Sequence, residues 1–166
     1  MTTARALTPD DAESYVALRR EMLADAPWAF YASPGHDRGS DPAQVRASLE
    51  KPDHAILAVE ERGELLAVAG VHREETPKRR HVATLWSVYV TPSARGRGLG
   101  RMVVSAAVET ARRWPGIEVV VLTVSENAPA AQALYESLGF VAWGVEPNAL
   151  RVDGRSYAET NMRLPV

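Results

Sequence analysis

The sequence predicts an α/β domain with a mixed β-sheet, and three observations support this fold class. Strand-like and helix-like patterns follow one another in the order β-α-α-β-β-β-α-β-α-β-β, which is typical of a sheet covered by helices. The run IEVVVLTV at residues 117–124 is rich in β-branched residues and does not alternate, as expected of a strand buried on both faces. A glycine-rich segment, RGRGLG at residues 95–100, joins an apolar run to a helical pattern.

The first half of the chain carries patterns for four strands and two helices. The strands are expected at residues 4–7, in a hairpin over residues 54–75 that turns at Gly63, and at residues 81–90. Each helix begins behind a capping residue that is followed by proline. These caps are Thr8, before a helix with Leu18, Met22 and Leu23 on its apolar face, and Asp41, before the helix at residues 42–51. The helices are separated by a predicted loop over residues 26–42.

The second half predicts two helices and three strands, with proline and glycine marking most of the boundaries. In chain order we expect a helix over residues 98–113 that stops at Pro115 and Gly116, the strand at 117–124, a helix with Asn127 as N-cap, Pro129 in its first turn and Gly139 at its end, and two strands over 140–164 joined through Asp153 and Gly154. Glu146, Pro147 and Asn148 are expected to interrupt the first of these two strands.

Composition limits the class of protein. A chain of 166 residues suits one well-buried core, so a single domain over residues 1–166 is expected. The formal net charge of −2 argues against binding nucleic acid through bulk charge, because that affinity depends on neutralising phosphates. The lack of cysteine excludes a thiol nucleophile, a disulfide framework and a cysteine-based zinc site.

Two further features bear on location and metals. The start, MTTARALTPDD, lacks the apolar segment of a signal peptide, and no apolar run is long enough to cross a membrane. We therefore expect a cytoplasmic protein that does not bind membranes. The four histidines, at positions 36, 54, 72 and 81, do not show metal-ligand spacing, so no metal site is expected.

The segment RGRGLG is the strongest local signal. A Walker A loop needs a lysine after its last glycine, and the dinucleotide fingerprint needs glycine or alanine at position 101, which is Arg101 here. A glycine-rich turn without a ligand stays open from this segment alone. However, glycines in the first turn of a helix leave backbone N–H groups free at the positive end of the dipole, and Arg95 and Arg97 add local charge. The pattern therefore predicts a site for a pyrophosphate-bearing cofactor.

Two longer stretches carry a family resemblance. VYVTPSARGRGLG at residues 88–100 and VVVLTVSENAPAAQALYESLGF at residues 119–140 together resemble the GCN5-related N-acetyltransferase (GNAT) family. Arg95, Gly98 and Gly100 match the family signature Arg/Gln-x-x-Gly-x-Gly/Ala. The resemblance implies a single-domain fold with a mostly antiparallel sheet of about seven strands, about four flanking helices and central strands that splay apart.

The resemblance also implies a donor and its binding residues. Acetyl-CoA would place its pyrophosphate on the amides of residues 95–100 and pair its pantetheine arm with residues 88–90. The implied contacts are Val88, Tyr89, Val90, Arg95, Gly96, Arg97, Gly98, Leu99, Gly100, Arg101, Asn127 and Tyr135. The backbone N–H of Tyr89 would stabilise the oxyanion, and Tyr135 would protonate the departing thiolate. A plain N-cap role for Asn127 and a core role for Tyr135 are the structural alternatives.

The acceptor side is less defined by the sequence. Trp28, Phe30 and Tyr31 are expected to line the acceptor cavity, with core packing as the alternative. Some family members carry a glutamate base where this chain has Thr84, so the base stays open among His72, His81, Glu74, Glu75 and Glu146. We expect direct transfer from acetyl-CoA to a primary amine, on a small molecule or a protein, and the resemblance is compatible with a homodimer. The alternative is a non-catalytic module that binds or senses acyl-CoA.

Overall fold

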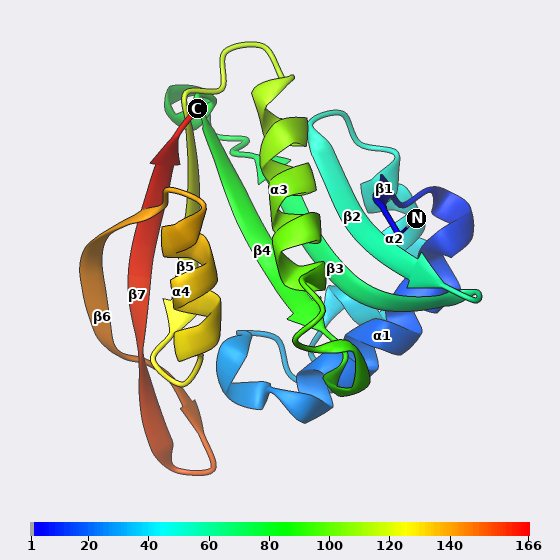
Figure 1. Ribbon diagram of the computed structural model, residues 1–166, viewed down its shortest axis with the longest axis horizontal. Coiled ribbons are helices and arrows are strands. Elements are labelled where there is room, and N and C mark those ends of the chain that lie inside the picture. Colours follow the sequence, from blue (N-terminus) through cyan, green and yellow to red (C-terminus); the bar gives the residue numbers. More distant parts are fainter. Residues whose placement is uncertain (1) are drawn as a thin grey trace.

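The computed structural model describes residues 2–166 and confirms the α/β fold (Figure 1). The strands are β1 (Ala4–Ala6), β2 (His54–Glu61), β3 (Glu64–Arg73), β4 (Val82–Val90), β5 (Val119–Ser125), β6 (Val141–Val152) and β7 (Arg155–Pro165). The helices are α1 (Ala12–Asp25), α2 (Pro42–Leu49), α3 (Leu99–Arg112) and α4 (Pro129–Ser137). Within the described residues no helix is both long and apolar enough to cross a membrane.

The seven strands form one sheet in the order β1-β2-β3-β4-β5-β7-β6. All neighbours are antiparallel except β4 and β5, which run parallel and are connected through α3. The parallel pairing covers only residues 82–84 of β4 and 119–121 of β5. Beyond these residues the two strands diverge, as Figure 1 shows. The predicted splay of the central strands is therefore confirmed.

Two hydrophobic layers cover the two faces of the sheet. On one face α3 buries Val103 and Ala107 against strand residues such as Val120, and α4 joins the same cluster through Tyr135. On the other face α1 and α2 enclose a second cluster that includes Met22. Each fully buried valine or methionine side chain stabilises the fold by about 1.5 to 3 kcal/mol. Helices cover both faces of the sheet on either side of the point where β4 and β5 diverge. The gap between these two strands therefore lies inside the protein.

The structure corrects one predicted cap. Asp41 caps α2 as expected, since its carboxylate accepts from the Ala43 N–H at 2.9 Å. The N-cap of α4 is Ala128 rather than Asn127, and no side chain caps this helix. A turn in which the Ala128 N–H donates to the Ser125 carbonyl, at 2.9 Å, shifts the helix start by one residue. Asn127 is therefore exposed and does not act as the N-cap.

The expected break in the penultimate strand is a bulge. Strand β6 is continuous, but its register with β7 shifts between Glu146 and Leu150. Asn148 adopts a left-handed conformation there, with φ of 53°. β6 lies at the edge of the sheet, where proline is tolerated because its missing N–H faces no partner strand. The prediction of an interruption over residues 146–148 was thus too strong.

Candidate active site

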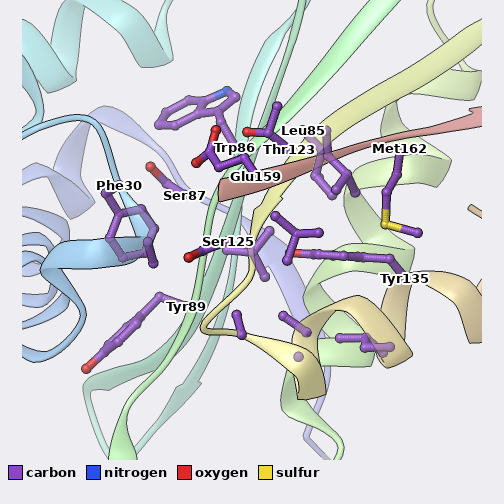
Figure 2. Close-up of a pocket in the computed structure, with 18 of the residues that line it drawn as sticks. Phe30, Leu85, Trp86, Ser87, Tyr89, Thr123, Ser125, Tyr135, Glu159 and Met162 are labelled. Atoms are coloured by element: carbon purple, nitrogen blue, oxygen red, sulfur yellow. The ribbon is translucent and has the colours of Figure 1, made fainter. Parts of the chain in front are cut away.

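A cavity of about 1420 Å³ opens where β4 and β5 diverge. Its walls come from these two strands, from the start of α3, from α4, from β7 and from the loop that follows α1. Figure 2 shows side chains from several of these elements pointing into one space. The cavity therefore joins the two faces of the sheet through the gap between its central strands.

A β-bulge in β4 contributes to the gap. Val68 of β3 pairs with Tyr89 and Gly70 pairs with Trp86, so Ser87 and Val88 together oppose a single residue of β3. Ser87 has a φ of 50°. A bulge bends its strand and increases the local twist, which turns the second half of β4 away from β5. Among the residues that the structure describes, no strand pairs with the β5-facing edge of residues 85–90.

The glycine-rich segment forms a turn whose geometry is compatible with the predicted anion site. Gly96 and Gly98 adopt φ of 76° and 79°, and a Cβ atom at either position would meet nothing within 4 Å. Gly98 is the N-cap of α3. Among residues 2–166, the amides of residues 96–101 find no backbone acceptor. A row of free N–H groups at the positive end of a helix is a site for phosphate.

The arginines of this segment are engaged by exposed partners. Arg95 pairs with Asp25 and also donates from Nε to the Val90 carbonyl at 3.1 Å. Arg97 pairs with Glu61, and Arg101 donates to the Ser137 hydroxyl at 2.6 Å. Exposed ion pairs contribute at most about 1 kcal/mol, so a phosphate group can compete for Arg95 and Arg97. Arg95 and Arg101 line the cavity; Arg97 does not.

Tyr135 reaches the cavity from α4. Its side chain is buried and packs edge-on against Phe140, with ring centroids 5.9 Å apart. In Figure 2 its hydroxyl points toward the middle of the cavity. Burial raises the pKa of the Tyr135 hydroxyl, so this group is protonated at neutral pH. The structure thus places a buried proton donor at the gap.

The Tyr89 hydroxyl contacts α1, and the Tyr89 backbone N–H points away from the gap between β4 and β5. Its hydroxyl donates to Glu21 and Asp25 of α1 at 3.0 and 3.1 Å, and burial together with these carboxylates raises its pKa. The Thr91 N–H donates to the Leu66 carbonyl of β3. Since N–H groups alternate in direction along a strand, the Tyr89 N–H also points to β3. This geometry does not support the predicted oxyanion contact from Tyr89.

The predicted acceptor residues all border the cavity. Trp28, Phe30 and Tyr31 lie in the loop after α1 and line it. This loop is anchored by Arg19, which forms a bidentate ion pair with Asp37 at 3.0 and 3.1 Å and also donates to Ser87 of the β4 bulge. Asn127 is not among the lining residues, although the neighbouring Ala128 is. The roles of these residues in binding remain predictions.

The candidates for a general base are not brought together. Of those left open by the sequence, His81 lines the cavity, whereas His72, Glu74 and Glu75 line a separate pocket. Burial lowers the pKa of His72. Thr84 occupies the position at which some family members carry a glutamate. Its hydroxyl donates to the Glu74 carboxylate at 2.5 Å, so Glu74 contacts Thr84 but does not line the cavity.

The sequence reading overlooked a carboxylate in the cavity wall. Glu159 of β7 is 3% exposed and lines the cavity. Glu159, Asn161 and Arg163 alternate with Thr160, Met162 and Leu164, and this period of two was the available signal. A polar stripe at that spacing places all three side chains on one face of a strand.

The sequence is similar to those of known acetyltransferases. A model of the acetyltransferase (GNAT) family matches residues 18–140. The chain is 30% identical to the N-alpha-acetyltransferase RimI of Mycobacterium tuberculosis, over 92% of this chain and 86% of that protein. It is 32% identical to the mycothiol acetyltransferase of Salinispora tropica, over 88% of this chain and 47% of that protein. The chain thus spans about half the length of the mycothiol acetyltransferases that it matches.

Solved structures agree with this relationship. The yncA protein of Salmonella typhimurium, a putative acetyltransferase solved with its cofactor acetyl-CoA, superposes with a TM-score of 0.84 at 26% identity, over 99% of this chain and 94% of that one. A ribosomal-protein-alanine N-acetyltransferase from Brucella melitensis superposes with a TM-score of 0.84 at 23% identity, over 98% and 99% of the two chains. With its family model, its relatives and its fold in agreement, the chain belongs to the acetyltransferase (GNAT) family.

Proposed function

We propose that this protein is an N-acetyltransferase that transfers the acetyl group of acetyl-CoA directly to a primary amine while both substrates are bound. The observation that carries the proposal is the gap between β4 and β5, which connects the free amides of residues 96–101 to a cavity that contains the Tyr135 hydroxyl. The chain has no cysteine, so an acetyl group cannot be held on an enzyme thiol. Transfer through a cysteine thioester is therefore excluded for this chain, and direct transfer is the route that we propose.

The residues present fit acetyl-CoA. The free amides beside Gly96 and Gly98 can donate to a pyrophosphate, and the open space at both glycines allows it to approach the backbone. The unpaired edge of β4 offers peptide groups to the amides of a pantetheine arm, in the manner of an added strand. The acetyl-CoA complex of the yncA protein supports the same assignment.

Catalysis requires in-line placement and a proton for the leaving group. Acetyl-CoA supplies an acetyl group activated as a thioester. The walls of the gap hold this group and the amine in contact, which removes most of the entropic cost of their meeting. Tyr135 donates its proton to the departing sulfur; burial raises the pKa of its phenol, so the hydroxyl is protonated at neutral pH and available as the general acid. An amide of the β4 edge other than that of Tyr89 stabilises the oxyanion.

The acceptor is an amine-bearing molecule, either small or a peptide. The relatives named above include an N-alpha-acetyltransferase and a mycothiol acetyltransferase, so proteins similar to this chain are named for different acetylation reactions. The loop with Trp28, Phe30 and Tyr31 lies over the cavity and supplies the apolar part of the acceptor site.

A thiol-release assay tests this proposal. Purified protein is mixed with acetyl-CoA and a panel of primary amines, and acetyl-CoA affinity is measured by calorimetry. We expect Tyr135→Phe to lower kcat roughly 100-fold with acetyl-CoA affinity unchanged. Tyr157→Phe is the matched control, since Tyr157 is also buried but does not line the cavity.

Three outcomes decide between the alternatives. Equal turnover of Tyr135→Phe and the unmodified protein would refute the acid role. Acetyl-CoA binding without thiol release for any amine would favour the non-catalytic module, for which the substitution of the family glutamate by Thr84 is the supporting observation. A protein that neither binds acetyl-CoA nor releases thiol would refute both functions.

A further inference from the structure

Glu159 occupies an unusual position for a carboxylate. It lies on β7, directly opposite Ser125 of β5 and Glu146 of β6, and is only 3% exposed. Figure 2 shows its side chain directed into the cavity beside Trp86 and Thr123. A carboxylate in this place is removed from water but borders a space large enough for a ligand.

Within the described part of the chain, Glu159 has no ion-pair partner. Among residues 2–166, no Lys, Arg or His nitrogen lies within 4.0 Å of its carboxylate. Its single side-chain hydrogen bond comes from the Tyr31 hydroxyl, which donates to Oε2. Burying an ionised carboxylate without a cation costs several kcal/mol. Glu159 thus presents a buried acidic group to the cavity, at a point where a cationic ligand would be its ion-pair partner.

The surroundings of Glu159 specify the kind of cation. Phe30, Trp86 and Trp143 line the same cavity, and aromatic faces attract ammonium groups as well as apolar chains. No metal-binding group of three or more His, Asp or Glu side chains is found in the described part of the chain. The combination of one carboxylate with several aromatic rings suits a monoalkylammonium ion on an apolar stem.

We propose that Glu159, beneath Tyr31, is the subsite that binds the ammonium group of the acceptor and takes the proton that the amine must lose before it attacks. This inference rests on the proposed acetyl transfer and identifies its acceptor class as alkylammonium ions. Acceptors that carry a carboxylate beside the amine are disfavoured, because that carboxylate would be repelled by Glu159.

The proton transfers balance around this subsite. One N–H proton of the ammonium passes to Glu159, and the freed nitrogen lone pair forms the C–N bond while the C–S bond breaks. The sulfur takes the proton of Tyr135. The second N–H proton of the nitrogen returns to the Tyr135 phenolate through water, and Glu159 releases its proton to solvent. The net products are an amide, a thiol and one proton.

None of the other described groups that face Glu159 is a better candidate to accept the proton of the ammonium group. Glu146 lies opposite on β6 but is exposed, and Tyr31 approaches from the loop. Burial of the Tyr31 hydroxyl and its bond to Glu159 raise the pKa of Tyr31 to about 12, so Tyr31 remains a donor at neutral pH. From β4 and β5 the facing residues are Trp86, Thr123 and Ser125, which do not titrate near neutral pH.

The decisive experiment compares Glu159→Gln with Glu64→Gln, which removes an exposed carboxylate from β3. Hexylammonium is titrated into each protein and followed by tryptophan fluorescence, with hexanol as the neutral probe of equal length. We expect Glu159→Gln to weaken hexylammonium binding at least tenfold and to leave hexanol and acetyl-CoA binding unchanged. Glu159→Asp, which keeps the charge, is expected to retain most of the affinity for hexylammonium.

Activity adds a second measurement. With hexylamine as the acceptor, Glu159→Gln should lower kcat/KM by about 100-fold, whereas Glu64→Gln should leave it unchanged. Equal hexylammonium binding by Glu159→Gln and the unmodified protein, or none by the unmodified protein, would overturn the subsite. Failure to bind acetyl-CoA would refute the proposed function. The hexylammonium affinities of the unmodified protein and Glu159→Gln would still show whether Glu159 binds an ammonium group.

Discussion

The donor and acceptor halves of the cavity are built in different ways. The donor half consists of backbone groups, namely the amides of residues 96–101 and the open edge of β4. The acceptor half consists of side chains from distant parts of the chain, and its hydrogen bond from Tyr31 to Glu159 joins residues 128 positions apart. A donor site made of backbone depends on local conformation, whereas an acceptor site made of side chains depends on long-range packing.

A buried ion pair provides much of that packing in the acceptor half. The Arg19 and Asp37 side chains are 9% and 4% exposed, and Arg19 also lies over the Phe30 ring, 6.0 Å from its centroid. Through Ser87 the same guanidinium reaches the β4 bulge. The loop that carries the predicted acceptor residues is therefore attached to the central strand by one side chain.

The largest effect is expected from breaking this attachment. Arg19→Met leaves the buried Asp37 carboxylate without its cation, which should lower the free energy of unfolding by about 3 to 5 kcal/mol. It should also raise KM for the amine more than it weakens acetyl-CoA binding. Urea denaturation and steady-state kinetics measure the two effects.

The control for Arg19→Met is Arg5→Met. Arg5 also pairs with an aspartate, Asp11, but its side chain is 42% exposed, so the loss should not exceed about 1 kcal/mol. An equal, small loss of unfolding free energy in both variants would show that the Arg19–Asp37 ion pair does not hold the acceptor loop. The two halves of the cavity would then differ less in how they are stabilised.

The next effect tests whether the donor half depends on local backbone alone. Gly98→Glu introduces a side chain at φ of 79° and brings a negative charge to the free amides. Gly116→Glu introduces the same side chain at the same φ, and neither position has a neighbour within 4 Å of a Cβ. The strain is matched, about 1 kcal/mol in each case, but only Gly98 borders the cavity.

We therefore expect acetyl-CoA affinity, measured by calorimetry, to fall roughly 100-fold in Gly98→Glu, which corresponds to about 2.7 kcal/mol. Gly116→Glu should bind acetyl-CoA as the unmodified protein does. Equal weakening in both variants would mean that backbone strain, and not the anion site, controls donor binding.

The same contrast explains what could be predicted from the sequence. The strand β4, the helix α3 and the glycine turn depend on neighbouring residues, and the sequence shows them directly. Glu159 reaches the cavity only because β7 pairs with β5 in one particular register. Strand partners at such separations are set by the whole sheet, so the acceptor carboxylate could not be located from local patterns.

Smaller features were missed for related reasons. Gly70 of β3 leaves room for the Trp86 ring, which occupies the position that a Cβ would need. This requirement depends on β3 and β4 being side by side and has no local signature. Asn127 carried a strong local signal as an N-cap, yet the turn from Ser125 moved the helix start to Ala128. Tertiary contacts thus changed a boundary that local propensity had placed one residue away.

The smallest expected effect is a shift in the titration of Tyr31, which reports directly on the acceptor half. Its folded pKa of about 12 exceeds the value near 10 of a free phenol. The stabilising contribution of the protonated hydroxyl is therefore fully present below about pH 10 and is lost as the pH rises through about 12. Glu159→Gln should lower the pKa of Tyr31 toward 10, because it removes the neighbouring negative charge.

Phenolate absorbance in a pH titration measures this shift, and Tyr31→Phe identifies which step belongs to Tyr31. Tyr31 is 70% exposed, and its raised pKa comes from partial desolvation of its hydroxyl and from the carboxylate of Glu159 beside it. A Tyr31 that titrates near 10 in the unmodified protein would show that its hydroxyl does not stay on Glu159 in solution. The long-range contact between Tyr31 and Glu159 would then contribute little to the acceptor half, while the donor half would still be formed by its local turn.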